Sequence, residues 1–174
     1  MKHKFYRSIQ KGFTILELVV YIALLSMVLI ALLQSMSMTM RAFSNLRISR
    51  DINDSAIKAM ERMTRDIKNA SSVNMTESTF GAEPSRLTIN TYDTSGNPLL
   101  VEYFATSSSL HVREDGVDMG ALLSAKTELE ALVFYYVSTG TSEGVKIELH
   151  LRSTRGGTTD NDHFYNTVML RGAY

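Results

Sequence analysis

The 174-residue sequence predicts an α+β fold in which one long N-terminal helix packs against an antiparallel β-sheet. Two observations predict the helix. Residues 13–33 form an apolar run, and neither Gly nor Pro occurs from residue 13 to residue 80. A third observation predicts the sheet, because apolar and polar residues alternate in short segments after residue 85.

A basic leader precedes the apolar run. Residues 1–12 contain four basic side chains and no acidic one, whereas Glu17 is the only acidic or basic residue in 13–33. About 20 apolar residues, at a rise of about 1.5 Å each, span the hydrocarbon core of a bilayer. Residues 13–33 are therefore predicted to cross a membrane once. Since Lys and Arg favour the cytoplasmic flank, we expect the N-terminus inside and the C-terminal domain outside.

The junction between leader and apolar run reads Lys11-Gly12-Phe13-Thr14-Ile15-Leu16-Glu17. It resembles the prepilin signal of type IV pilins and of the related pseudopilins of type II secretion. In that family, a membrane-embedded peptidase cuts after the Gly and methylates the new N-terminus. The resemblance implies cleavage between Gly12 and Phe13, loss of the leader 1–12 and N-methylation of Phe13. A secretory signal would instead be cut after its apolar core, whereas the candidate site here lies before the core, so the core would be retained.

Glu17 is predicted to be an assembly residue. A lone carboxylate in hydrocarbon costs on the order of 3 kcal/mol and by default marks a functional position. In a filament, Glu17 of one subunit and the N-terminal charge on Phe13 of its neighbour could pair, which would remove both penalties. The alternative is a plain signal anchor whose Glu17 lies close enough to the headgroups to stay hydrated.

Residues 34–75 are predicted to continue the helix outside the membrane as an amphipathic segment that ends between Ser71 and Met75. Its polar face carries Arg50, Asp54, Lys58, Arg65 and Asp66. Apolar residues recur at steps of three and four on the other face, as expected for a helix that covers a core. They are Ile48, Ile52, Ala56, Met60, Met63, Ile67 and Ala70.

Residues 76–174 are predicted to form the antiparallel β domain, beginning with a loop at 76–84. Residues 117–128 are ambiguous between a short helix and an irregular crossover, and 153–163 read as a polar loop. About six short strands are expected, near 86–91, 99–103, 110–113, 130–137, 145–151 and 164–171.

Within the pilin family, the long helix, the stretch Met63–Ala70 and the C-terminal Val168–Arg171 look most like the J-type minor pseudopilin and the W-type minor pilin. This resemblance implies a pilin-like fold and a structural subunit of a type IV pilus or a secretion pseudopilus. Removal of the leader leaves 14 Lys and Arg against 18 Asp and Glu. That balance argues against a nucleic-acid partner.

No enzymatic activity and no cofactor are expected. The sequence has no Cys, no Gly-x-Ser-x-Gly elbow and no phosphate-binding loop. The one metal candidate is a calcium loop at Asp160 and Asp162, whose oxygen ligands follow Gly156-Gly157 closely. A solvated turn is the alternative for these residues.

The function expected from these observations is that of a structural subunit, minor rather than major, of the cytoplasmic (inner) membrane and then of the pilus or pseudopilus. The resemblance implies as partners the prepilin peptidase and methyltransferase, other pilin or pseudopilin subunits and the inner-membrane assembly platform; membrane lipid follows from the apolar run. The rival hypothesis is a single-pass membrane protein that does not polymerise and whose outer β-domain binds a partner or ligand.

Overall fold

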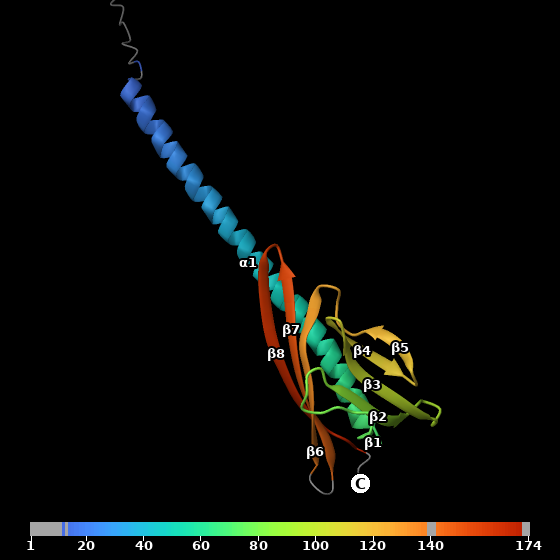
Figure 1. Ribbon diagram of the computed structural model, residues 1–174. Coiled ribbons are helices and arrows are strands. Elements are labelled where there is room, and N and C mark those ends of the chain that lie inside the picture. The colour runs from blue at the N-terminus through green and yellow to red at the C-terminus, as the bar shows by residue number, and fades with distance from the viewer. Residues whose placement is uncertain (1–11, 13, 139–141, 172–174) are drawn as a thin grey trace, which may run out of the picture. The chain divides into compact units, whose positions relative to one another are not determined.

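The structure is a computed structural model that describes residues 12, 14–138 and 142–171. It contains one helix, α1 (Ile15–Asn69), followed by eight strands in two antiparallel sheets (Figure 1). The chain divides into two compact units, residues 1–43 and 44–174. The predicted α+β class is confirmed, but two sheets replace the single sheet of about six strands.

Helix α1 begins directly after Thr14, whose Oγ1 accepts a 3.2 Å hydrogen bond from the backbone N–H of Glu17. This N-cap satisfies one of the backbone donors that a helix start leaves without an intrahelical partner. The helix ends at Asn69, slightly before the predicted range. It ends there because the N–H of Ser71 bonds the Asn90 carbonyl at 2.8 Å, which draws the chain into β1 (Ser72–Val73).

The buried stripe on the second half of α1 confirms the predicted helical period at most positions. Met60 is only half-buried, and Ser55 and Ala59 are buried in addition. Small side chains at these positions allow the sheets to approach the helix backbone closely. Asp66, which was expected on the polar face, is instead half-buried against Tyr103.

The first sheet is a meander of five strands in the order β1-β2-β3-β4-β5. The segment 117–121 is strand β5, rather than the helix or crossover considered from the sequence. It lies at the edge of the sheet and is mostly exposed, so it carries no alternation of apolar and polar residues. After β1, the strands are β2 (Arg86–Tyr92), β3 (Pro98–Thr106), β4 (Ser109–Glu114) and β5 (Val117–Ala121).

The second sheet contains β6 (Thr127–Ser138), β7 (Glu143–Arg155) and β8 (Thr158–Met169), in that order. The predicted polar loop at 153–163 is wrong, because these residues end β7 and begin β8. Only Gly156 and Gly157 turn the chain, with φ values of 58° and 80°. The end of this hairpin is exposed, so its strands are held by pairing with each other and show no apolar pattern.

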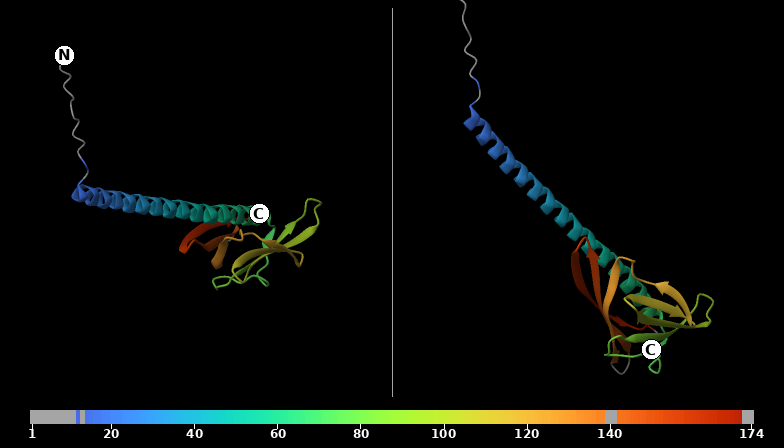
Figure 2. Two further views of the ribbon diagram at one scale, coloured as in Figure 1. Left: turned by 90° about the horizontal axis from the view of Figure 1, so that it is seen from above. Right: turned by 45° about the horizontal axis from the view of Figure 1, so that its top comes forward.

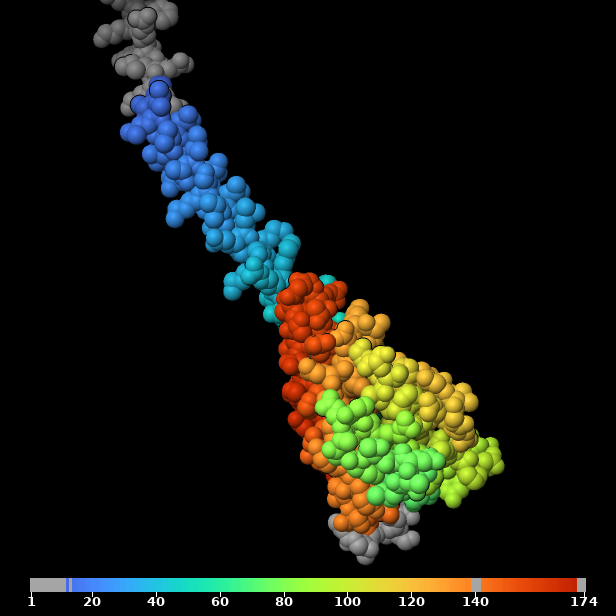
Figure 3. Space-filling view, in the orientation of Figure 1, coloured from blue at the N-terminus to red at the C-terminus, as the bar shows by residue number. Residues whose placement is uncertain are grey.

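Both sheets lie against the second half of α1 and enclose one core within residues 44–174 (Figure 2). Backbone hydrogen bonds join the sheets, from Ser85 to Leu132 at 3.1 Å and from Leu129 to Ser108 at 2.6 Å. The space-filling view shows β6–β8 and β2–β5 in contact along this seam (Figure 3). The largest fully buried side chains are Tyr103, Phe134, Ile48, Ile52, Met63, Ile67, Leu87, Ile89, Leu110, Leu132, Ile147 and Leu149.

Candidate functional site

The predicted cleavage position lies just before the helix. Gly12 is exposed, and a Cβ added to it would meet no atom within 4 Å. Since α1 starts only at Ile15, the backbone at Gly12 is outside regular structure, where a peptidase can reach it. Phe13, the other residue of the predicted scissile bond and the predicted methylation site, lies outside the described residues.

Glu17 lies in the first turn of α1 and makes two local hydrogen bonds. Its N–H is held by Thr14 Oγ1, and its Oε1 accepts a 2.8 Å bond from the Tyr21 hydroxyl one turn later. A carboxylate at this position also interacts favourably with the positive end of the helix dipole. The local sequence therefore fixes the Glu17 side chain along the helix surface, at the start of the apolar segment.

The segment that follows Glu17 exposes its apolar side chains on all sides of α1. From Ile15 to Leu33, every large aliphatic residue is exposed, and the helix is long and apolar enough to cross a membrane. Ser26 is one of the few polar residues here, and its hydroxyl bonds the Ile22 carbonyl at 2.7 Å. This apolar surface needs lipid or other apolar helices around it, because no described residue of its own unit covers it.

Residues 7–33 match the family described as the prokaryotic N-terminal methylation motif. The chain carries the type IV pilin signal. This signal covers the end of the leader, Gly12, Glu17 and the apolar segment just described. No curated protein and no solved structure matches the chain.

The pilin signal indicates a structural protein of the type IV pilin or pseudopilin kind. It implies processing by a prepilin peptidase and assembly with other pilins. Together with the exposed apolar helix, it is consistent with an inner-membrane protein that spans the bilayer once.

A polar cluster that the sequence did not reveal connects α1 to the first sheet. Asp66 Oδ2 accepts hydrogen bonds from the Tyr103 hydroxyl at 2.6 Å and from Arg62 Nε at 2.7 Å. Arg62 also bonds Glu114 at 2.5 Å. Burial, reinforced by the Asp66 charge, raises the pKa of Tyr103, and the bond to Asp66 raises the pKa of Arg62. The i,i+4 spacing of Arg62 and Asp66 was the only sequence signal for this cluster.

The residues predicted to form a calcium loop lie in strand β8 instead of a loop. Asp160 Oδ1 accepts the backbone N–H of Asn161 at 3.1 Å, and Asp162 Oδ1 accepts that of His163 at 2.8 Å. Over the described part of the chain, no group of three or more His, Cys, Asp or Glu side chains is placed to hold a metal ion. In the structure these two carboxylates accept backbone N–H groups of the edge strand β8, and calcium binding stays a prediction.

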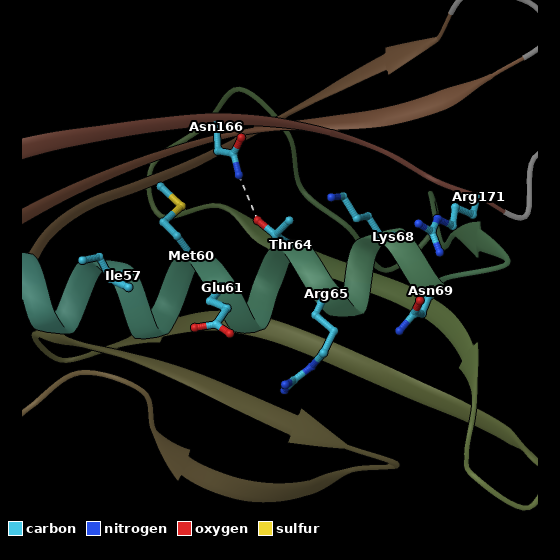
Figure 4. Close-up of a pocket in the computed structure, with 9 residues that line it drawn as sticks. All are labelled: Ile57, Met60, Glu61, Thr64, Arg65, Lys68, Asn69, Asn166 and Arg171. Atoms are coloured by element: carbon cyan, nitrogen blue, oxygen red, sulfur yellow. Dashed lines mark hydrogen bonds between the residues drawn. The ribbon is translucent and has the colours of Figure 1, made fainter.

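A groove of about 500 Å³ runs between the C-terminal half of α1 and the end of β8 (Figure 4). Asn166 bridges it, since its Nδ2 donates a 2.9 Å hydrogen bond to Thr64 Oγ1. Sequence reasoning missed this groove because its two walls are about 100 residues apart in the chain. The lining residues are Ile57, Met60, Glu61, Thr64, Arg65, Lys68, Asn69, Asn166 and Arg171.

Proposed function

We propose that this chain is a minor structural subunit of a type IV pilus or a type II secretion pseudopilus. In this proposal, the leader 1–12 is removed and Phe13 is methylated at its new N-terminus. Residues 13–33 hold the subunit in the inner membrane and then form the helical core of the filament. Residues 34–75 and 76–174 form the part outside the membrane.

The observation that carries the proposal is the pilin signal followed by an uncovered apolar helix with one acid in its first turn. A signal anchor needs only apolar residues in the bilayer. The Tyr21 hydroxyl binds Glu17, but one neutral donor does not cancel the charge of a carboxylate in hydrocarbon. The N-terminal ammonium of a neighbouring subunit supplies the missing opposite charge, and methylation leaves that charge intact.

The minor role is supported by the resemblance to J-type pseudopilins and W-type pilins. The partners in this role are the prepilin peptidase, other pilin subunits and the inner-membrane assembly platform. The rival is a single-pass protein that does not polymerise and binds a ligand through its β-domain. The rival predicts an uncut N-terminus and indifference to the removal of Glu17.

The test is Glu17→Ala in the native host, with insertion, leader cleavage and recovery in sheared filaments measured separately. We expect the variant to insert and to be cut, but its incorporation into filaments to fall at least tenfold, because the N-terminal charge of the neighbour loses its partner. The matched control is Ser26→Ala in the same segment. Among the residues that the structure describes, the Ser26 hydroxyl bonds only its own helix, so incorporation of this variant is expected at the wild-type level.

Incorporation of the Glu17→Ala variant at the wild-type level would contradict the role proposed for Glu17. A chain that keeps its leader in the native host would favour the rival.

A further inference from the structure

The groove between α1 and β8 combines an apolar floor with an excess of positive charge. Ile57 is 61% exposed at one end, and Met60 is half-buried beside it. Its lining carries three cations, Arg65, Lys68 and Arg171, and one carboxylate, Glu61. In Figure 4, Lys68 points to the same side of the helix as Thr64, toward β8, whereas Arg65 leaves the helix on the opposite side.

These cations have few ion-pair partners among the described residues. Among the described side chains, Lys68 and Arg171 have no ion-pair partner, and Arg65 reaches only Asp66, at 3.6 Å. The N–H of Arg171 bonds the Lys68 carbonyl at 3.1 Å, which holds Arg171 against the last turn of α1. Two independent segments therefore place positive charge at the same end of the groove.

Strand β8, which forms the other wall of the groove, is the edge of its sheet. Asn161 and His163 direct their N–H groups away from β7, where Asp160 and Asp162 bind them. By the alternation of a strand, the N–H groups of Tyr165 and Thr167 point the same way, and beside the groove no carboxylate precedes them. One half of the edge is thus blocked by its own Asp side chains, and the half beside the groove is open.

We propose that this groove is a docking site for an extended acidic segment of a neighbouring filament subunit. The segment adds a strand to the open half of β8, and its carboxylates meet Lys68 and Arg171. Main-chain hydrogen bonds to a strand edge supply affinity for any extended segment, and the cations select an acidic one. The identification of the partner as a neighbouring subunit rests on the proposed function; the acidic, extended chemistry rests on the groove.

The experiment uses the full chain in detergent micelles and a fluorescent peptide of alternating Glu and Val. A second peptide carries Lys in place of Glu. Binding is measured by fluorescence anisotropy at low and high salt. We expect the Glu peptide to bind and the Lys peptide to bind at least tenfold more weakly. Higher salt should weaken binding of the Glu peptide, because the exposed charges are screened.

Charge reversal at Lys68→Glu is expected to weaken binding of the Glu peptide about tenfold, the fold-change that corresponds to about 1.4 kcal/mol. The matched control is Lys58→Glu, an exposed lysine on the same helix that does not line the groove. Equal binding by these two variants, or equal binding of the Glu and Lys peptides to the wild-type chain, would overturn the proposal.

The strand edge is tested by Thr167→Pro, which removes an outward N–H beside the groove. Pro is tolerated at an edge position whose N–H faces away from the sheet. Thr159→Pro makes the same change at an outward position near the exposed hairpin end. We expect at least a fivefold loss of binding for Thr167→Pro and none for Thr159→Pro, with unchanged circular dichroism for both.

Binding by Thr167→Pro at the wild-type level would overturn strand addition. If Thr167→Pro loses its fold, the comparison of Lys68→Glu with Lys58→Glu alone decides whether the groove binds the Glu peptide. Leader cleavage is measured on native protein and peptide binding on purified chain, so failure of the proposed function and failure of this docking site are distinguishable.

Discussion

Tyr103 is the residue at which the helix and the first sheet are joined by a charged group. Its ring is fully buried, and its hydroxyl donates to Asp66 on α1 at 2.6 Å. Arg62 binds the same carboxylate from one turn earlier on the helix. The carboxylate thus has two donors in a partly buried place, where an unmet charge would be costly.

Tyr103→Phe is expected to lower the free energy of unfolding by about 1.5–3 kcal/mol, because a hydrogen bond to a charged group is lost in the core. The measurement is urea unfolding of the full chain in detergent. Tyr135→Phe is the control, since Tyr135 is exposed and its hydroxyl is 3.3 Å from Glu148. Its effect should stay within about 0.5 kcal/mol. Equal effects of the two substitutions would contradict the role given to the Tyr103–Asp66 bond.

The same tyrosine predicts a dependence of stability on pH. Burial raises the folded-state pKa of Tyr103 above the ordinary value of 10.0. A raised pKa means that the neutral hydroxyl is favoured in the fold. Its stabilisation is therefore complete below pH 10.0 and is lost as pH rises through the folded-state pKa. The difference in unfolding free energy between wild type and Tyr103→Phe should therefore shrink as the pH rises above 10.0. A constant difference from neutral to strongly alkaline pH would rule this out.

At the scale of elements, the two halves of α1 differ in how their apolar residues are distributed around the helix. From Ile48 to Ile67, the apolar residues other than Ile57 lie on one stripe that the sheets cover fully or, at Met60, in part. From Ile15 to Leu33, they surround the helix and stay exposed. The first pattern is typical of a helix that covers the core of a globular domain. The second is typical of a helix surrounded by lipid or by other apolar helices.

Met63→Ala tests the packing of the covered stripe. Met63 is fully buried, so truncation should leave a cavity and cost about 2–5 kcal/mol of unfolding free energy. Ile57→Ala, on the exposed side of the same helix, should cost less than about 1 kcal/mol. Thermal or urea unfolding of both variants measures the contrast, and similar losses in the two would show that the stripe is not the packed face.

Alternation of apolar and polar residues predicted some of the strands and not others. Strands β2 and β7 were predicted from the alternation of apolar and polar residues. Burial follows this period of two along most of β7, whereas in β2 the polar Thr88 is buried as well. Strand β5 and the hairpin end of β7–β8 were missed, since exposed edge strands are held by backbone pairing and have no such pattern. Asp66 was misplaced for a related reason: its partner Tyr103 is 37 residues away, and no local rule connects them.

At the scale of the whole chain, the two compact units differ in how much of their function the sequence reveals. The N-terminal unit carries its information locally. Gly12, Thr14 and Glu17 lie within a few residues of one another, so the pilin signal was recognisable from the sequence, and the matched family confirms it. The groove between α1 and β8 required the fold, because it depends on contacts between Thr64 and Asn166.

The proposed function requires that the chain is processed as a pilin-like subunit. The most direct measurement is the intact mass of the protein purified from its native membrane. We expect the mass of residues 13–174 plus one methyl group, because cleavage after Gly12 and methylation of Phe13 are coupled in the family that the signal resembles. A full-length, unmethylated mass would contradict the claim and leave Glu17 as part of an ordinary signal anchor.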